Sequence, residues 1–254
     1  MIFVLVSESR RMVVFDTLGE SLTLLRRHPK LLAYLAVVVT VTNVLSSGDL
    51  LGLSASGQLL LGALSLVVGL AIAVGTAGLV NDTATEDRVS GGAFAASVLQ
   101  NYLPWVAAII VIAVVSVVAV LVFAIAFQIP LVNVLAALAF LVLALAAALT
   151  LQFVDLAIVV DDEGPVEGIK RSYGVATAHL GSVIGYTLLE VVVFIVILIP
   201  AVVALLGTGW PESRPSIEPT PGLLAAFAIA ILGTVVIQTW RVLFYRRLSD
   251  RFGR

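Results

Sequence analysis

The chain has 254 residues, of which 61% are hydrophobic and only 12% are charged. Soluble domains carry about 25% charged residues, so this composition is that of a protein that lies largely in lipid. Because the chain has no cysteine, disulfides, thiolate metal sites and cysteine nucleophiles are excluded, and the net charge of −2 identifies no partner by itself.

Long apolar runs without charge divide the chain. A helix crosses a hydrocarbon core of about 30 Å with about 20 apolar residues, and six runs are of that order. The predicted spans are residues 31–45, 57–80, 104–127, 131–151, 181–206 and 223–245. The run from Trp105 to Phe127 does not alternate apolar and polar residues, which excludes the strands of an outer-membrane barrel. The sequence therefore predicts an all-α integral membrane fold with six transmembrane helices.

An amphipathic segment, residues 13–28, precedes the first span. Its apolar residues recur at spacings of three and four and are Val14, Leu18, Leu22 and Leu25. Thr17 followed by Glu20 fits a capping box, so a well-formed helix is predicted to begin there. Pro29 is predicted to end the segment, and a polar turn at residues 46–49 follows the span.

The second span has a face of small residues. Ser65, Gly69, Ala73 and Ala77 recur every fourth residue. In lipid, such a face lets helices approach closely, because van der Waals packing drives their association. The pattern predicts helix packing within one bundle, with a dimer seam as the alternative. A polar loop is expected at residues 81–90.

A second amphipathic segment runs from Ser90, a candidate N-cap, to Leu103. Its apolar line is Phe94, Val98 and Tyr102, against the polar residues Ser97, Gln100 and Asn101. Pro104 is predicted to open the third span. A tight turn at residues 128–133 makes spans three and four antiparallel neighbours.

The stretch from Phe153 to Tyr173 leaves the fourth span, turns through an acidic corner and enters a third amphipathic helix. Pro165 suits the first helical position. The predicted apolar line of this helix is Val166, Ile169, Tyr173, Ala176 and Leu180. The acidic run at residues 161–163 is interpreted as a solvated loop, with a divalent-cation site as the alternative. Four prolines predict an irregular loop at residues 207–222.

The three amphipathic segments, called elbow helices below, recur at a fixed spacing. Pro29, Pro104 and His179 stand 75 residues apart, each at a junction between an elbow helix and a span. We therefore expect a single polytopic domain, residues 1–254, with a threefold repeat of about 75 residues. Its units are residues 13–81, 88–157 and 163–254, and each contains one elbow helix and two spans.

Basic residues are distributed unevenly between the two sides of the predicted membrane. With six spans, thirteen of the fourteen Lys and Arg residues share one side, and Arg214 alone lies on the other. Loops rich in Lys and Arg remain in the cytoplasm. The distribution predicts a multi-pass plasma-membrane protein with both termini and all three elbow helices in the cytoplasm.

Glu190 is the clearest intramembrane polar candidate. It lies about ten residues into the fifth span, so it is about 15 Å deep at 1.5 Å per residue. Ionisable groups in lipid usually face the bundle interior. Glu190 is interpreted either as a proton or cation site, with Gln238 and Thr234 as neighbours, or as a protonated acid bonded to a neighbouring helix. Asp155 and Arg241 form a second candidate group.

Asp155 lies near the cytoplasmic end of span four and Arg241 near that of span six, so the two can pair. This pair is interpreted as a structural anchor rather than a catalytic group. His28 and His179 lack the clustered carboxylates of a metal site, and we expect no metal and no cofactor.

Four cations are candidates for contact with lipid headgroups. They are Arg26 and Arg27 in the first elbow helix and Lys170 and Arg171 in the third. A basic residue near an anionic membrane surface contributes about 1 kcal/mol of attraction. The alternative is that these residues only anchor the cytoplasmic side.

The central stretch resembles a family of six-span membrane proteins. The matching residues are Phe153, Ala157, Ile158, Val159, Gly164, Gly168, Arg171 and Ser172, and residues 24–29 resemble the family's first elbow helix. The family comprises YciC-like proteins, the membrane domain attached to some glycerophosphodiester phosphodiesterases, and related archaeal domains of unknown function. Asp155 and Gly168 depart from its usual proline and alanine. The resemblance implies an integral membrane domain without an established activity.

Together these observations predict a non-enzymatic membrane-organising or accessory protein. We expect its elbow helices to contact lipid headgroups or a membrane-protein partner, including a second copy of the chain, and we expect no nucleic-acid partner. The alternative is a small transporter with Glu190 as its proton or cation site. An intramembrane enzyme is a third class, but no nucleophile with an activating base is visible in the sequence.

Overall fold

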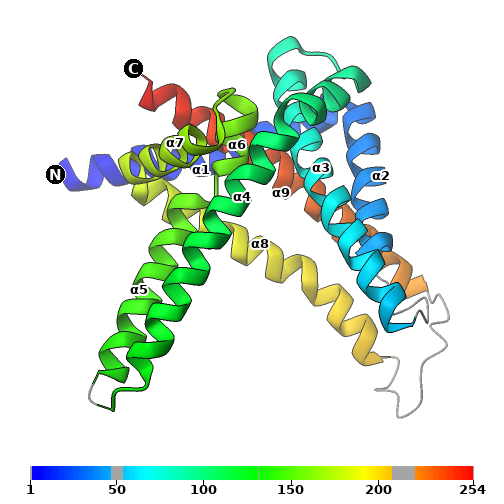
Figure 1. The fold of residues 1–254 in the computed structure, drawn as a ribbon. Coiled ribbons are helices and arrows are strands. Elements are labelled where there is room, and N and C mark those ends of the chain that lie inside the picture. The colour runs from blue at the N-terminus through cyan, green and yellow to red at the C-terminus, as the bar shows by residue number, and fades with distance from the viewer. Residues whose placement is uncertain (1, 47–53, 131, 208–220, 254) are drawn as a thin grey trace. The chain divides into compact units, whose positions relative to one another are not determined.

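The computed structural model describes residues 2–46, 54–130, 132–207 and 221–253. These residues form helices and no strand (Figure 1). The helices are α1 (Ile2–Arg27), α2 (Pro29–Ser46), α3 (Ala55–Glu86), α4 (Gly91–Phe127), α5 (Asn133–Leu151), α6 (Val154–Val160), α7 (Pro165–Ala178), α8 (Leu180–Gly207) and α9 (Pro221–Phe252). Most of the turn expected at residues 46–49 and of the loop expected at 207–222, including Arg214, lies outside the described residues.

Among the residues that the structure describes, five helical segments are long and apolar enough to cross a membrane. They are Ala55–Glu86, Gly91–Phe127, Asn133–Val160, Leu180–Pro200 and Leu224–Phe252. The helix of the first predicted span has a shorter apolar part, Pro29–Val44. The described part of the chain is therefore all-helical, with five candidate membrane spans.

The chain divides into two compact units. Unit 1 comprises Met1–Gly69 and Gly185–Phe244, and unit 2 comprises Leu70–Ile184 and Tyr245–Arg254. The single polytopic domain and its threefold repeat stay predictions.

In unit 1, α1 and α2 meet at His28, and Pro29 opens α2 as predicted. The predicted capping box is wrong, because Thr17 lies inside α1 and its hydroxyl donates to the carbonyl of Val13 at 2.9 Å. The predicted apolar line is also partly wrong. Leu22 is 45% exposed, whereas the polar Thr17 and Ser21 are fully buried.

Three aromatic side chains from α8 and α9 form the centre of unit 1. The ring of Tyr186 lies 4.5 Å from that of Trp240 and 4.5 Å from that of Phe244, with which it is stacked. Trp240 Nε1 donates to Thr17 Oγ1 at 3.0 Å, which joins α9 to α1. Because an indole N–H needs an acceptor when buried, the hydroxyl of Thr17 explains why a polar residue faces this core.

In unit 2, α3 and α4 are longer than the sequence predicts. The polar segment expected as a loop at residues 81–90 is helical as far as Glu86. Pro104 does not end a helix but lies inside the continuous α4, and Ser90 occupies the N-cap position of that helix. The expected polar side is partly inverted, because Ser97 and Asn101 are buried.

The contact between α3 and α4 explains these buried polar residues. Ser97 Oγ donates to the carbonyl of Val74 on α3 at 3.0 Å. Gly78 lies directly against the Ser97 side chain, and Gly75 against the ring of Phe94. The small residues that allow close approach here are therefore two glycines outside the predicted Ser65–Ala77 series.

Helices α4 and α5 form an antiparallel hairpin, as predicted (Figure 1). Phe123 on α4 contacts Phe140 on α5, with ring centroids 5.1 Å apart. The chain breaks after Leu151 and continues in the short α6, whose residues from Val154 to Val159 are all buried. Helix α6 packs against α4 and α7.

Helix α7 begins at Pro165 as predicted, and its predicted apolar line divides between the interior, where Ile169 packs, and the outer surface. Val166 is 47% exposed and Tyr173 is 57% exposed, whereas Gly168, Ser172 and Val175 are buried, together with Ala176 from the predicted line. Ser172 Oγ donates to the carbonyl of Thr150 at 2.7 Å, near the end of α5. This bond gives a partner to a carbonyl at a helix end, where the last four lack one within the helix.

Candidate functional site

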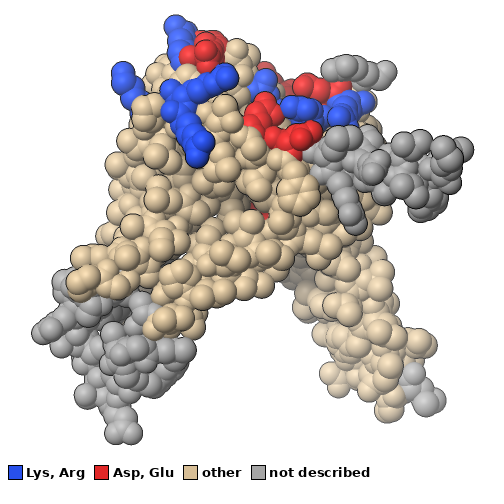
Figure 2. All heavy atoms as spheres, turned by 180° about the vertical axis from the view of Figure 1, so that it is seen from behind, with Lys and Arg blue, Asp and Glu red and all other residues tan. Residues whose placement is uncertain are grey.

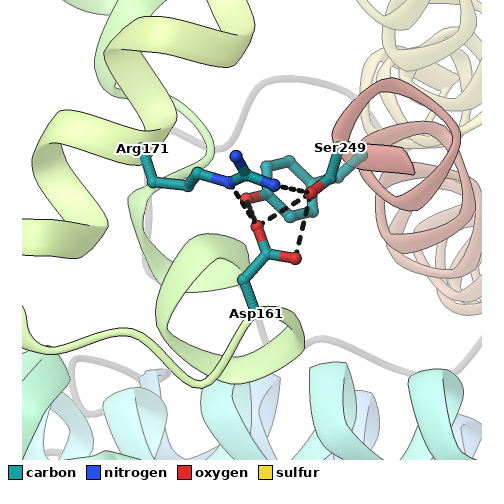
Figure 3. A network of polar contacts seen from close by, with 4 residues as sticks. Asp161, Arg171 and Ser249 are labelled. Atoms are coloured by element: carbon teal, nitrogen blue, oxygen red, sulfur yellow. Dashed lines mark hydrogen bonds and ion pairs between the residues drawn. The ribbon is translucent and has the colours of Figure 1, made fainter. Parts of the chain in front are cut away.

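The acidic corner of unit 2 lies between α6 and α7. Asp161 follows the last residue of α6, and Asp162 has a positive φ of 56°, which turns the chain toward α7. An aspartate tolerates this left-handed conformation better than most residues. The turn leaves the Asp161 side chain half-buried and facing the C-terminal part of α9 (Figure 3).

Asp161 accepts hydrogen bonds from three side chains. Arg171 Nε donates to Asp161 Oδ2 at 2.9 Å, and Tyr245 Oη donates to the same oxygen at 2.6 Å. Ser249 Oγ lies 2.8 Å from Oδ2 and 3.0 Å from Oδ1. Figure 3 shows the carboxylate enclosed between Arg171 and Ser249. We call these four residues the Asp161 cluster.

Arg171 makes two further contacts with the end of α9. Its Nη2 donates to Ser249 Oγ at 2.9 Å, and its guanidinium carbon lies 4.9 Å from the ring centroid of Phe252. Burial alone lowers the pKa of Arg171, but the Asp161 carboxylate more than offsets this effect and raises the pKa above its ordinary value. Arg171 is therefore a permanent cation held in place by a carboxylate and an aromatic ring.

Two more bonds connect this corner of unit 2 to earlier helices. Gln100 Nε2 on α4 donates to Asp162 Oδ1 at 2.9 Å. Arg246 Nη1 on α9 donates to the carbonyl of Asn81 on α3 at 3.2 Å. Polar contacts thus join α4, α7 and α9 to the corner after α6, and α9 to the last part of α3.

The chemistry of the Asp161 cluster is that of a structural ion pair. Ser249 bonds directly to the carboxylate that Arg171 and Tyr245 also contact, and the charge of Arg171 stabilises that carboxylate as an anion. Among the described residues, no three His, Asp or Glu side chains gather as metal ligands.

The residues of the family-like pattern have packing roles around this cluster. The ring of Phe153 lies 5.7 Å from that of Tyr245, and Gly168 lies against the side chain of Ile158. Sequence reasoning missed Asp161 as a partner of α9. A usable signal was the spacing of Tyr245, Ser249 and Phe252, which stand on one face of a helix.

Glu190 lies in unit 1 on α8. Tyr186 Oη donates to Glu190 Oε1 at 3.2 Å, and the charge of Arg241 acts on the Glu190 carboxylate. Gln238 lies on α9, and its buried Oε1 has no hydrogen-bond partner among the described residues. Thr234, the other expected neighbour, donates to the carbonyl of Ala230 on its own helix at 2.8 Å.

The other candidate residues are dispersed. Asp155 is 5% exposed in α6 of unit 2, whereas Arg241 belongs to unit 1, so their pairing stays a prediction. Arg26, Arg27 and Lys170 are exposed, but Arg171 is held in the Asp161 cluster. Whether these residues contact headgroups remains a prediction.

Comparison with known proteins places the chain in a family. A family model described as a domain of unknown function, DUF7847, matches residues 12–248. No curated protein and no solved structure shows significant similarity to the chain. The comparisons show no link to YciC-like proteins or to phosphodiesterase membrane domains, so that part of the resemblance stays a prediction. Since the match covers nearly the whole chain, the protein belongs to the DUF7847 family.

Proposed function

We propose that this protein is a non-enzymatic, multi-pass protein of the plasma membrane that binds anionic lipid headgroups through cytoplasmic surface helices. In this proposal α2 is a sixth span. Helix α1, the first part of α4 and helix α7 are the three elbow helices, which lie at the membrane surface. Both termini are cytoplasmic.

The exposed surface of the spans supports the membrane part of the proposal. In α4 and α5 only 6% of the most apolar segment is buried within the protein. Large side chains such as Val114, Leu121 and Leu141 are more than half exposed. Helices that are apolar on all sides need an apolar environment, and here the acyl chains of lipid provide it.

The outward face of α7 is the observation that carries the functional part. Val166, Lys170 and Tyr173 are spaced four and three residues apart, so they share one side of the helix, and all three are exposed. Tyrosine is enriched where hydrocarbon meets water, and the long stem of lysine lies along apolar surface while its ammonium reaches the headgroups. This combination fits a helix that lies in the headgroup region.

The distribution of charge agrees with this arrangement. On the face drawn in Figure 2, long stretches of surface carry only uncharged residues. Arg26 and Arg27 in α1 are exposed like Lys170. Arg171 is engaged by Asp161, so Lys170 is the cation of α7 that we assign to headgroups.

The proposal is tested by measuring how much anionic lipid the purified protein retains. The protein is reconstituted in nanodiscs that contain equal amounts of phosphatidylglycerol and phosphatidylcholine, and bound lipids are counted by native mass spectrometry after release. Lys170→Gln and the double variant Arg26→Gln/Arg27→Gln are compared with wild type. One lost cation is expected to weaken phosphatidylglycerol binding about fivefold, since its attraction is about 1 kcal/mol.

Arg88→Gln is the matched control, because it removes one positive charge from a residue that is already paired with Glu86 at 2.7 Å. It is expected to retain phosphatidylglycerol like wild type. Equal retention of both lipids by the wild-type protein would refute the proposal. If Lys170→Gln loses a co-purifying protein but retains lipid like wild type, the partner of Lys170 is that protein and not lipid.

A further inference from the structure

Glu190 on α8 lies at the same level of unit 1 as Gln238 and Arg241 on α9, as the contacts between these two helices indicate. Tyr186 contacts Trp240 and Phe244, and Ile197 fills the space beside Gly233. Helices α8 and α9 therefore run antiparallel. In this register, Glu190 on α8 lies opposite the segment of α9 around Gln238. Gln238 and Arg241 are three residues apart and share one side of α9.

The groups around Glu190 can interact with its side chain both as a carboxylate and as a carboxylic acid. The charged or titratable groups that act on Glu190 are Arg241 from α9 and Tyr186 from α8. Tyr186 donates one hydrogen bond to the carboxylate at 3.2 Å, and Arg241 carries a positive charge on the side of α9 that Gln238 shares.

Gln238 provides the second, independent observation. Its buried Oε1 lacks a hydrogen-bond donor among the described residues. A buried acceptor without a donor costs about 1–3 kcal/mol, and a membrane interior offers little water to replace one. An ionised Glu190 cannot supply this donor, but a protonated Glu190 can.

We propose that Glu190 is an intramembrane proton-binding site that exchanges partners, with the carboxylate paired to Arg241 and the carboxylic acid donating to Gln238 Oε1. In the binding step a hydronium ion gives its proton to one carboxylate oxygen and leaves as water. The new O–H bonds to Gln238, and the charge of Arg241 is released from its pair. A metal ion fits this site less well, because the positive charge of Arg241 repels it.

The site lies deep enough to carry protons into the bilayer. Glu190 is ten residues from the start of α8, which corresponds to about 15 Å along the helix. Proton-binding carboxylates at such depth are typical of pumps and transporters. This function is separate from headgroup binding, since Glu190, Gln238 and Arg241 are distinct from the exposed cations assigned above.

The test is infrared difference spectroscopy of the full-length protein in lipid vesicles, titrated from alkaline to acidic pH. The carbonyl stretch of a carboxylic acid is resolved from the bands of carboxylates. Wild type is expected to gain such a band with a hydrogen-bonded frequency, and Glu190→Gln is expected to lose it. Glutamine preserves the size of the side chain, so this variant leaves the packing of α8 in place.

Two further variants separate the partners of Glu190. Gln238→Leu is expected to shift the band to higher frequency, because the acid keeps only the hydrogen bond from Tyr186, and to lower the pH midpoint by about one unit. Arg241→Gln is expected to raise the midpoint, because the carboxylate loses its stabilising charge. Gln58→Leu, at an exposed position of α3, makes the same chemical change as Gln238→Leu and is expected to leave band and midpoint unchanged.

The proposal is overturned if wild type gains no band that depends on Glu190. It is also overturned if Gln238→Leu and Arg241→Gln both leave the band and its midpoint unchanged. If Glu190→Gln fails to fold, the shift of the carboxylic-acid band between wild type and Gln238→Leu alone decides whether the band belongs to Glu190.

Discussion

Tyr245 donates a 2.6 Å hydrogen bond to Asp161, a residue 84 positions earlier in the chain. This bond joins the end of α9 to the corner between α6 and α7, within unit 2. The same tyrosine packs its ring against Phe153, so its packing and its hydroxyl can be tested separately.

Tyr245→Phe is expected to destabilise the protein while leaving the contact with Phe153 in place. A hydrogen bond to a charged group contributes about 1.5–3 kcal/mol, and Tyr245 is fully buried. Thermal unfolding in detergent, followed by circular dichroism, measures the loss. Tyr173→Phe is the control, because Tyr173 is 57% exposed and its variant is expected to melt like wild type. Equal melting of both variants would show that the Asp161 bond contributes nothing.

Asp161→Asn is expected to be more harmful than Asp162→Asn. The first change removes the charge that pairs with Arg171, whose side chain is only 24% exposed, and it leaves a cation without its carboxylate. Because the pair is partly screened by solvent, the expected cost is about 2 kcal/mol, below that of a fully buried pair.

Asp162 is exposed and accepts one bond from Gln100, so Asp162→Asn keeps an acceptor in place and is expected to cost little. The two variants make the same chemical change at adjacent positions. Thermal unfolding of both at neutral pH is the measurement. A larger loss in Asp162→Asn would contradict the assignment of Asp161 as the centre of the cluster.

Gly78→Ala and Gly69→Ala are expected to change stability in opposite directions. A methyl group at Gly78 meets the side chain of Ser97 on α4, so α3 and α4 must separate, and overpacking costs about 1–3 kcal/mol. A methyl group at Gly69 meets nothing within 4 Å. That variant is expected to gain up to about 1 kcal/mol from the higher helix propensity of alanine.

Thermal unfolding of the two glycine variants also decides which small residues bring helices together. The predicted face of Ser65, Gly69, Ala73 and Ala77 would make Gly69 the sensitive position. If Gly69→Ala destabilises the protein and Gly78→Ala does not, the predicted small-residue face is the contact surface. That face would then pack against another helix or a second copy of the chain.

The sequence predicted the elements better than their faces, and the reason is physical. Pro29 and Pro165 each open a helix as expected, because proline suits the first helical turn. Pro104 instead lies inside the continuous α4, since a membrane helix tolerates proline in its interior when neighbouring groups take up the freed backbone partners.

The apolar lines did not show which residues face the protein interior, because apolar periodicity marks the inside only in water. In lipid both faces of a helix can be apolar, so Val166 and Tyr173 face outward. Small polar residues then occupy the interior, as Ser97 and Ser172 do, since they allow close approach and satisfy backbone carbonyls.

Among the candidate sites, single residues could be predicted from the sequence, but contacts between helices could not. Glu190 was found from its depth in an apolar run, since one acid in such a run is conspicuous without any tertiary information. The predicted pairing of Arg241 with Asp155 stays a prediction, because spacing along the sequence does not show which helices are neighbours. The bond from Ser249 to Asp161, 88 positions apart, was out of reach for the same reason.

Thr17→Val distinguishes the observed role of Thr17 from the capping box that its sequence suggests. Valine keeps the shape of threonine but removes the acceptor of the Trp240 N–H, and Trp240 is fully buried. An unsatisfied buried donor costs about 1–3 kcal/mol, so the melting temperature is expected to fall. Thr23→Val is the control, because Thr23 is exposed and its hydroxyl donates to the carbonyl of Gly19 on its own helix.

If Thr17 were a helix cap instead, Glu20→Ala would destabilise the protein as much as Thr17→Val, and tryptophan fluorescence would not respond to either change. The structure predicts instead that Thr17→Val alters the emission of Trp240.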